Sequence, residues 1–181
     1  MSKYIYYNYF CKHIIRSGTS KVIPHKKAII NFGKNSKIYL SGRDLEIGFN
    51  QLRGSKSETH VRLDENAVWN CKNGGLLFYN TVLEIKPNAQ FSSGFFSMNG
   101  GSVVIAHRRI VFGEDVMLGR NIIVYDSDFH SLLDTNGVAY NVPKDVIIED
   151  HVWLTSNITV LKGVVIGKDS LITAQAAIKS R

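Results

Sequence analysis

The chain has 181 residues, of which 44% are apolar and 20% charged, so it can form one globular domain or one stack of repeats and is not a disordered chain. Its formal charge of +7 is uneven: residues 1–43 contain nine Lys or Arg and no acid, whereas residues 44–181 contain 13 bases and 15 acids. The nearly neutral body argues against nucleic-acid binding, and no apolar run approaches the roughly 18–20 residues of a membrane span.

Residues 1–27 are basic and rich in aromatic side chains. Tyr6, Tyr7, Phe10 and Ile14 are spaced to lie on one face of a short helix. Two interpretations of this segment stay open. It could cap the open end of the domain that follows, or it could make peripheral contact with an anionic membrane at the inner face of the cell, where Tyr, Lys and Arg are favoured. Its scattered bases do not fit a secretory signal.

From residue 28 onward the sequence consists of short β-branched runs separated by Gly, Asn, Asp and Lys, as in residues 28–33 and 45–48. Short strands with polar corners, in a chain with 3 Pro, are typical of an all-β solenoid. We therefore expect one domain over residues 28–181, with residues 1–27 as a separate N-terminal segment.

A six-residue period supports the solenoid. One inward side chain in every six, followed by a small residue at a tight corner, predicts three hexads for each triangular coil. The predicted inward positions are Ile85, Phe91, Ser97 and Val103, then Phe112, Leu118 and Val124, and finally Ile148, Leu154, Val160, Ile166, Ile172 and Ile178.

The period lapses over a loop at residues 125–145 and resumes in the same frame. A long polar segment pushed out of a regular stack usually has a function. The loop contains His130, which directly follows an aromatic residue and lies four and two residues after the acids Asp126 and Asp128. An imidazole in such a setting is a candidate general base, because histidine titrates near neutral pH.

Two segments resemble the hexapeptide-repeat acyltransferases: residues 148–167, which read IEDHVWLTSNITVLKGVVIG, and residues 126–130, which read DSDFH. The similarity is to the branch with maltose, galactoside and antibiotic acetyltransferases and the O-acetyltransferases of bacterial capsule and lipopolysaccharide. It is tight over residues 103–178 and looser over residues 28–102. It implies a left-handed parallel β-helix that forms a homotrimer, with acetyl-coenzyme A (acetyl-CoA) in a groove between two subunits.

The resemblance also implies roles for residues of the loop and of the following coil. His130 matches the general base that takes the proton of a sugar hydroxyl as the hydroxyl attacks the thioester. Either Asp126 or Asp128 would orient the imidazole ring. Trp153 matches a residue that forms a wall beside the thioester.

Further matches concern the coenzyme and the acceptor. Ser156 and Ala174 match corner residues whose backbone binds the pantetheine arm, and Lys179 lies near the position of a base that reaches the coenzyme phosphates. Asn99 matches a residue that contacts the acceptor. The resemblance implies no metal.

The predicted activity is direct transfer of an acetyl group from acetyl-CoA to a hydroxyl of a sugar or glycan, in the bacterial cytoplasm. Cys11 and Cys71 form no ligand cluster, fit a reduced compartment and lie far from the loop in sequence.

N-acetylation of an amino sugar is the alternative reaction. Thr173 and Gln175 replace glycines of the family corner, which leaves open a non-catalytic glycan-binding β-helix. The histidine spacing disfavours the zinc site of γ-type carbonic anhydrases.

Overall fold

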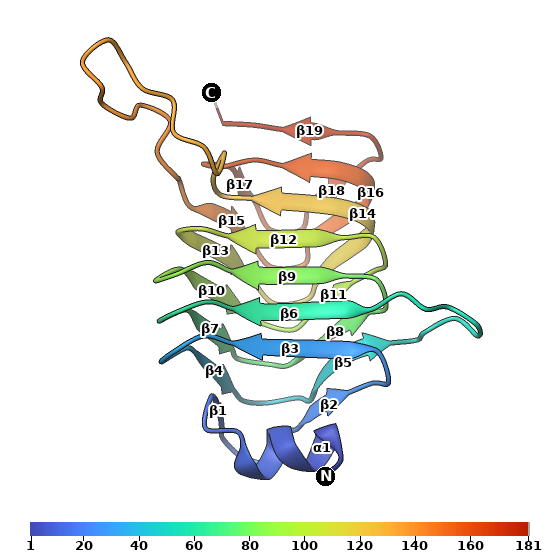
Figure 1. Cartoon of the computed structure of the whole chain (residues 1–181). Helices are drawn as coiled ribbons and strands as arrows, with labels where there is room; N and C mark the ends of the chain where they lie inside the picture. The colour runs from blue at the N-terminus through green and yellow to red at the C-terminus, as the bar shows by residue number, and fades with distance from the viewer. Residues whose placement is uncertain (181) are drawn as a thin grey trace.

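A computed structural model describes residues 1–180 as a three-sided parallel β-helix closed at its N-terminal end by a short helical cap (Figure 1). The cap consists of α1 (Lys3–Ile5) and one π-helical stretch (Tyr6–Phe10). The chain then coils with a left-handed turn toward its C-terminus, an exception to the right-handed rule for parallel crossovers. The predicted fold class is confirmed.

The three faces of the coil are parallel sheets, named here in chain order. The first face contains β1 (Ile14–Arg16), β4 (Lys37–Leu40), β7 (Val68–Cys71), β10 (Gln90–Ser93), β13 (Arg109–Phe112), β15 (Val146–Ile148) and β17 (Val165–Ile166). The second face contains β2 (Val22–Pro24), β5 (Leu45–Phe49), β8 (Gly75–Phe78), β11 (Phe96–Met98) and β18 (Leu171–Ile172). The third contains β3 (Ala28–Phe32), β6 (Thr59–Leu63), β9 (Val82–Ile85), β12 (Val103–Ala106) and β19 (Ala177–Ile178).

Two long strands, β14 (Val116–Tyr125) and β16 (Trp153–Val160), bend around the corner between the second and third faces. The first part of β14 pairs with β11 and its last part pairs with β12. The corner is tight, because a Cβ atom at Gly119 would lie 1.6 Å from the carbonyl oxygen of Thr155 in the next coil. Only glycine therefore fits at this position.

The six-residue frame holds in the C-terminal coils and fails earlier. Ile147 pairs with Val165, 18 residues further on, which is three hexads. Trp69 instead pairs with Phe91, 22 residues further on, because the earlier corners contain extra residues. The prediction that Ser97 and Val103 point inward is wrong, and the core positions beside them are Phe96, Met98 and Val104, which are fully buried.

Large side chains fill the middle of the coil. Trp69, Phe91, Phe96 and Phe112 are buried and contact one another with ring centroids 5.0–6.2 Å apart. Burial of each such side chain stabilises the fold by about 1.5–3 kcal/mol. The corners are stabilised differently: Asn35, Asn66 and Asn88 adopt positive φ and their side chains hydrogen-bond in a ladder from coil to coil, at 3.2 and 3.1 Å.

The β-helix begins before the predicted boundary at residue 28, because β1 pairs with β4 and β2 pairs with β5. The prediction that Tyr6, Tyr7, Phe10 and Ile14 lie on one face of a helix is wrong. Tyr7 is half-buried, Phe10 is exposed and Ile14 belongs to β1. The π-helical turn is the cause, since the Cys11 amide donates to the carbonyl of Tyr6, five residues back, instead of four.

No helix within residues 1–180 has both the length and the apolar character needed to cross a membrane.

Candidate active site

The loop that interrupts the hexads leaves the third face at Tyr125 and rejoins the first face at Val146. It projects from the body near the C-terminal end of the coil (Figure 1). A second, shorter excursion, which the sequence analysis did not detect, connects β5 to β6 over residues 50–58. Because strand β12 ends and strand β13 begins at the same edge, the turn with His107 lies in the coil below the loop.

Asp126 anchors the start of the loop to that turn. Its side chain is fully buried, and its carboxylate accepts hydrogen bonds from the backbone N–H groups of His107, Arg108 and Arg109 at 2.7, 2.8 and 2.7 Å. The predicted role of Asp126 in orienting His130 is not what the structure shows, because both of its oxygens are occupied by backbone amides. Asp126 instead stabilises the His107 turn, which lies below the loop.

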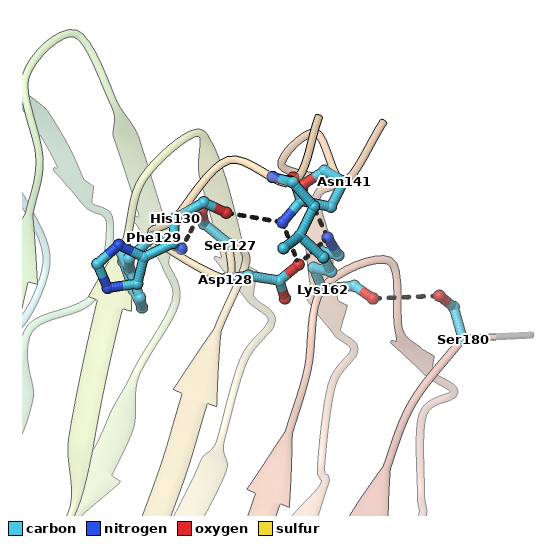
Figure 2. A network of polar contacts seen from close by, with 8 residues as sticks. Ser127, Asp128, Phe129, His130, Asn141, Lys162 and Ser180 are labelled. Atoms are coloured by element: carbon cyan, nitrogen blue, oxygen red, sulfur yellow. Dashed lines mark hydrogen bonds and ion pairs between the residues drawn. The ribbon is translucent and has the colours of Figure 1, made fainter. Parts of the chain in front are cut away.

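Asp128 fastens the loop to the next coil (Figure 2). Its carboxylate pairs with the Lys162 ammonium group and accepts from Asn141 Nδ2 at 2.9 Å. These two hydrogen bonds, the one from Lys162 first, hold the pKa of the Asp128 carboxyl below its ordinary value. Asn141 Nδ2 also donates to the backbone carbonyl of His130 at 2.7 Å, and Lys162 Nζ donates to the carbonyl of Asn141 at 2.8 Å. Asp128 thus fixes the backbone that bears His130.

The imidazole of His130 points away from this polar network (Figure 2). It lines a small cavity of about 140 Å³ together with His107, Phe129, Asn141 and neighbouring loop residues. Phe129, immediately before it, has φ of 60°, in the left-handed region that aromatic residues rarely adopt. Its amide donates to Ser127 Oγ at 3.0 Å. Strain of this kind is concentrated at functional sites, where it fixes the direction of a side chain.

Other predicted site residues lie at a different edge of the coil. Trp153 is 44% exposed on the outer side of the second face, in register with Met117 and Leu171. Ser156 lies at the bend of β16 between the second and third faces, and Ala174 lies between β18 and β19 at the same corner.

Asn99, between β11 and β12, is at that corner too, and its side-chain amide donates to the carbonyl of Leu118 at 3.3 Å. Lys179 follows β19 and therefore lies at the same corner as His130. One chain thus places His130 and Lys179 at one edge of its third face, Asn99, Ser156 and Ala174 at the other edge, and Trp153 on the second face, and it does not bring them together.

Three residues of the loop site were not predicted from the sequence: His107, Asn141 and Lys162. They are distant from His130 in sequence, and only the stacking of coils brings them near it. The coil spacing was the signal that could have found His107, because Val104 pairs with Val124 and the two strands end at the same edge. Among residues 1–180, no three His, Cys, Asp or Glu side chains are grouped to hold a metal ion.

Comparison with known proteins identifies acetyltransferases as similar to this chain. No family model matches the chain. It is 36% identical over 135 residues to a polysialic acid O-acetyltransferase of Neisseria meningitidis, covering 72% of this chain and 58% of that protein. It is 37% identical over 90 residues to a galactoside O-acetyltransferase of Lactococcus lactis, covering 48% of this chain and 42% of that protein.

The fold has a solved counterpart. The crystal structure of the polySia specific acetyltransferase NeuO aligns with a TM-score of 0.51 and 20% identity, over 89% of this chain and 78% of that one. The chain spans less than two thirds of the length of the curated relatives named above. The repeats, the fold and these relatives confirm that the chain resembles the hexapeptide-repeat acyltransferases, among them the capsule and galactoside O-acetyltransferases.

Proposed function

We propose that this protein is an acetyl-CoA-dependent O-acetyltransferase that acts on a glycan hydroxyl, with His130 as the general base. The observation that carries the proposal is the position of the His130 imidazole, which lines a small cavity on a loop whose backbone is held in place by Asp126 and Asp128. The O-acetyltransferase relatives support the reaction class.

In this mechanism His130 accepts the proton of the glycan hydroxyl while the hydroxyl oxygen attacks the thioester carbonyl carbon. The tetrahedral oxyanion then collapses, the carbon–sulfur bond breaks, and the imidazolium returns the proton to the leaving thiolate. The products are the acetyl ester and the free thiol of coenzyme A. A covalent acetyl-cysteine route is disfavoured, because both cysteines are buried and burial raises the pKa of Cys71 to about 12.

The division of site residues between two corners supports a shared site. If the third face of each subunit turns toward a threefold axis, the His130 corner of one subunit meets the corner of the next subunit that contains Ser156 and Ala174, and Trp153 lies on the adjoining second face. The outer side of that face suits such contact, because Val82, Val103 and Ile123 form an in-register apolar column along it. We propose a homotrimer in which two subunits complete each active site.

The trimer proposal predicts a mass of about 60 kDa by light scattering. Val103→Arg places a charge in the apolar column and is expected to give monomers of about 20 kDa that keep the β-sheet circular dichroism and lose acetyl transfer. Ser97→Arg, on the outer side of the second face, is the matched control and should leave the mass unchanged. A wild-type monomer at micromolar concentration would contradict the proposal.

We further propose that the acceptor is an acidic glycan. A groove of about 470 Å³ runs along the outer side of the first face from β1 to β13. Its walls combine an aromatic ring, hydroxyl and amide groups and three cations with no acid: Ile15, Arg16, Ser17, Tyr39, Leu40, Ser41, Asn70, Lys72, Ser92, Arg109 and Val111. Arg109 also pairs with Asp145 at 3.2 Å.

The groove has a shape and a position that suit an extended chain. It is hollow in the middle because the outward positions Asn70 and Ser92 are small, whereas Tyr39 and Val111 are bulkier. Its end at Arg109 adjoins the His107 turn that lines the cavity of His130. A carboxylate-bearing glycan in this groove would direct a hydroxyl of its end toward the base.

A kinetic comparison tests the acceptor. Lys72→Gln should raise KM for a sialic acid oligomer by about tenfold, the effect of losing one charge-assisted contact, and leave kcat and KM for acetyl-CoA unchanged. Release of coenzyme A thiol measures the rates. Lys168→Gln, an exposed lysine outside the groove, is the control. Equal use of a neutral glycan, or no effect of Lys72→Gln, would contradict an acidic acceptor in this groove.

A further inference from the structure

The N-terminal cap presents an exposed apolar surface, which we name the N-terminal patch. It consists of Ile5, Tyr6, Tyr9 and Phe10, and the side chains of Tyr9 and Phe10 are 64% and 66% exposed. A monomeric protein rarely places neighbouring large apolar side chains in water unless they bind something.

The exposure of the patch follows from how the cap is held. Asn8 is buried, donates to the carbonyl of Val22 at 2.7 Å and accepts from the Val22 amide at 2.9 Å. Tyr7 donates its hydroxyl to the carbonyl of Ile30 at 3.2 Å, and Cys11 is buried. These three residues face the first coil, so the π-helical turn directs the patch residues outward. The segment therefore has one side that caps the coil and another side that is exposed to solvent.

The segment that contains the patch is basic, although the Asp44 carboxylate accepts a hydrogen bond from the backbone amide of Lys21 at 2.7 Å. Residues 1–43 hold nine Lys or Arg and no acid. The Arg16 guanidinium and the Lys21 ammonium group lie 5.8 and 6.0 Å from the centroid of the Tyr9 ring. Lys12, two residues after Phe10, is exposed. Aromatic rings interleaved with cations are the composition of segments that bind at the interface of an anionic bilayer.

We propose that the N-terminal patch docks the protein on an anionic membrane surface. Tyr6, Tyr9 and Phe10 enter the headgroup region, and Lys12 and Lys21 pair with lipid phosphates. The patch and the His130 loop lie at opposite ends of the coil (Figure 1). Five sheet steps separate β1 from β15, so the loop stands about 25 Å from the docked end at about 4.8 Å for each step.

This orientation has two consequences, which rest on the proposed function. The acidic groove ligand would extend from the membrane end of the first face, at Arg16, toward Arg109 beside the loop. In a cyclic trimer all three patches face the same side, so weak single contacts add through effective concentration. The docking itself does not depend on catalysis.

Vesicle flotation tests the docking. The full chain should float with vesicles of phosphatidylcholine and phosphatidylglycerol at low salt, and much less at high salt or with phosphatidylcholine alone. Tyr9→Ser with Phe10→Ser, and separately Lys12→Gln with Lys21→Gln, should each weaken binding at least about tenfold. The matched controls are Leu52→Ser, an exposed apolar residue of the 50–58 excursion, and Lys56→Gln with Lys168→Gln.

Several outcomes would overturn the proposal. They are no flotation of the wild type at low salt, equal loss in the patch and control variants, or flotation that ignores lipid charge. A doubling of mass without lipid that depends on Tyr9 and Phe10 would instead assign the patch to a second copy of the chain. Flotation of His130→Ala should equal that of the wild type, so failure of the catalytic proposal and failure of docking are distinguishable.

Discussion

Replacement of His130 by alanine is expected to lower acetyl transfer by about 10²–10⁴-fold, the usual contribution of general acid–base catalysis. The trimer and the melting temperature should be unchanged, because the side chain lies on an exposed loop and none of its ring atoms takes part in the network that pins the loop. Initial rates of coenzyme A release measure the effect. The loss should be in kcat, since the base acts in the transition state.

His107 provides the matched control for this variant. It lines the same cavity, and its ring lies 6.2 Å from that of Phe129. We expect His107→Ala to reduce the rate much less than His130→Ala, because its ring belongs to the turn below and not to the loop. Near-full activity of His130→Ala on a verified acceptor, or a larger loss in His107→Ala, would remove His130 as the base.

Asp126→Asn is expected to lower the free energy of unfolding by about 2–4 kcal/mol, measured by urea denaturation. The buried carboxylate accepts three backbone N–H groups, and an amide in its place has one oxygen fewer and two donors that face those N–H groups. Acetyl transfer should fall as well, because the turn under the loop loses its anchor.

Asp128→Asn is expected to lower turnover more than stability, the reverse of Asp126→Asn. Its carboxylate is partly exposed, so stability should change little, whereas the loop loses its attachment to Lys162 and turnover should fall. Because the folded-state pKa of Asp128 is lowered, its contribution is complete above the ordinary carboxyl pKa and is lost as the pH falls through the lowered value. Equal loss of stability in the two variants would contradict these separate roles.

The sequence predicted the coil best where each corner has the same length. From Val146 to Ile178 the hexads alternate inward and outward without insertions, so one period describes every face. In earlier coils a corner gains or loses a residue, and a shift of one residue reverses which side chains point inward. Phe96 and Met98, and not Ser97, therefore fill the core.

The site was predictable in part for a similar reason. The loop and His130 are local in sequence, and the interruption of the repeats pointed to them. Asp126 and Asp128 could not be told apart, because their partners come from coils below and above, at His107 and Lys162. The patch residues could not be separated from the cap either, since one π-helical turn changes which of Tyr7 and Phe10 faces inward.

The proposed O-acetyl transfer to a glycan can be tested by the chemical identity of the product. Purified protein would be incubated with acetyl-CoA labelled in its acetyl group and a sialic acid oligomer, and the labelled glycan would be treated with mild alkali. We expect label on a glycan hydroxyl as an alkali-labile ester, formed by the wild type and not by His130→Ala. Label in an alkali-stable amide, or no transfer to any glycan by a protein that binds coenzyme A, would contradict it.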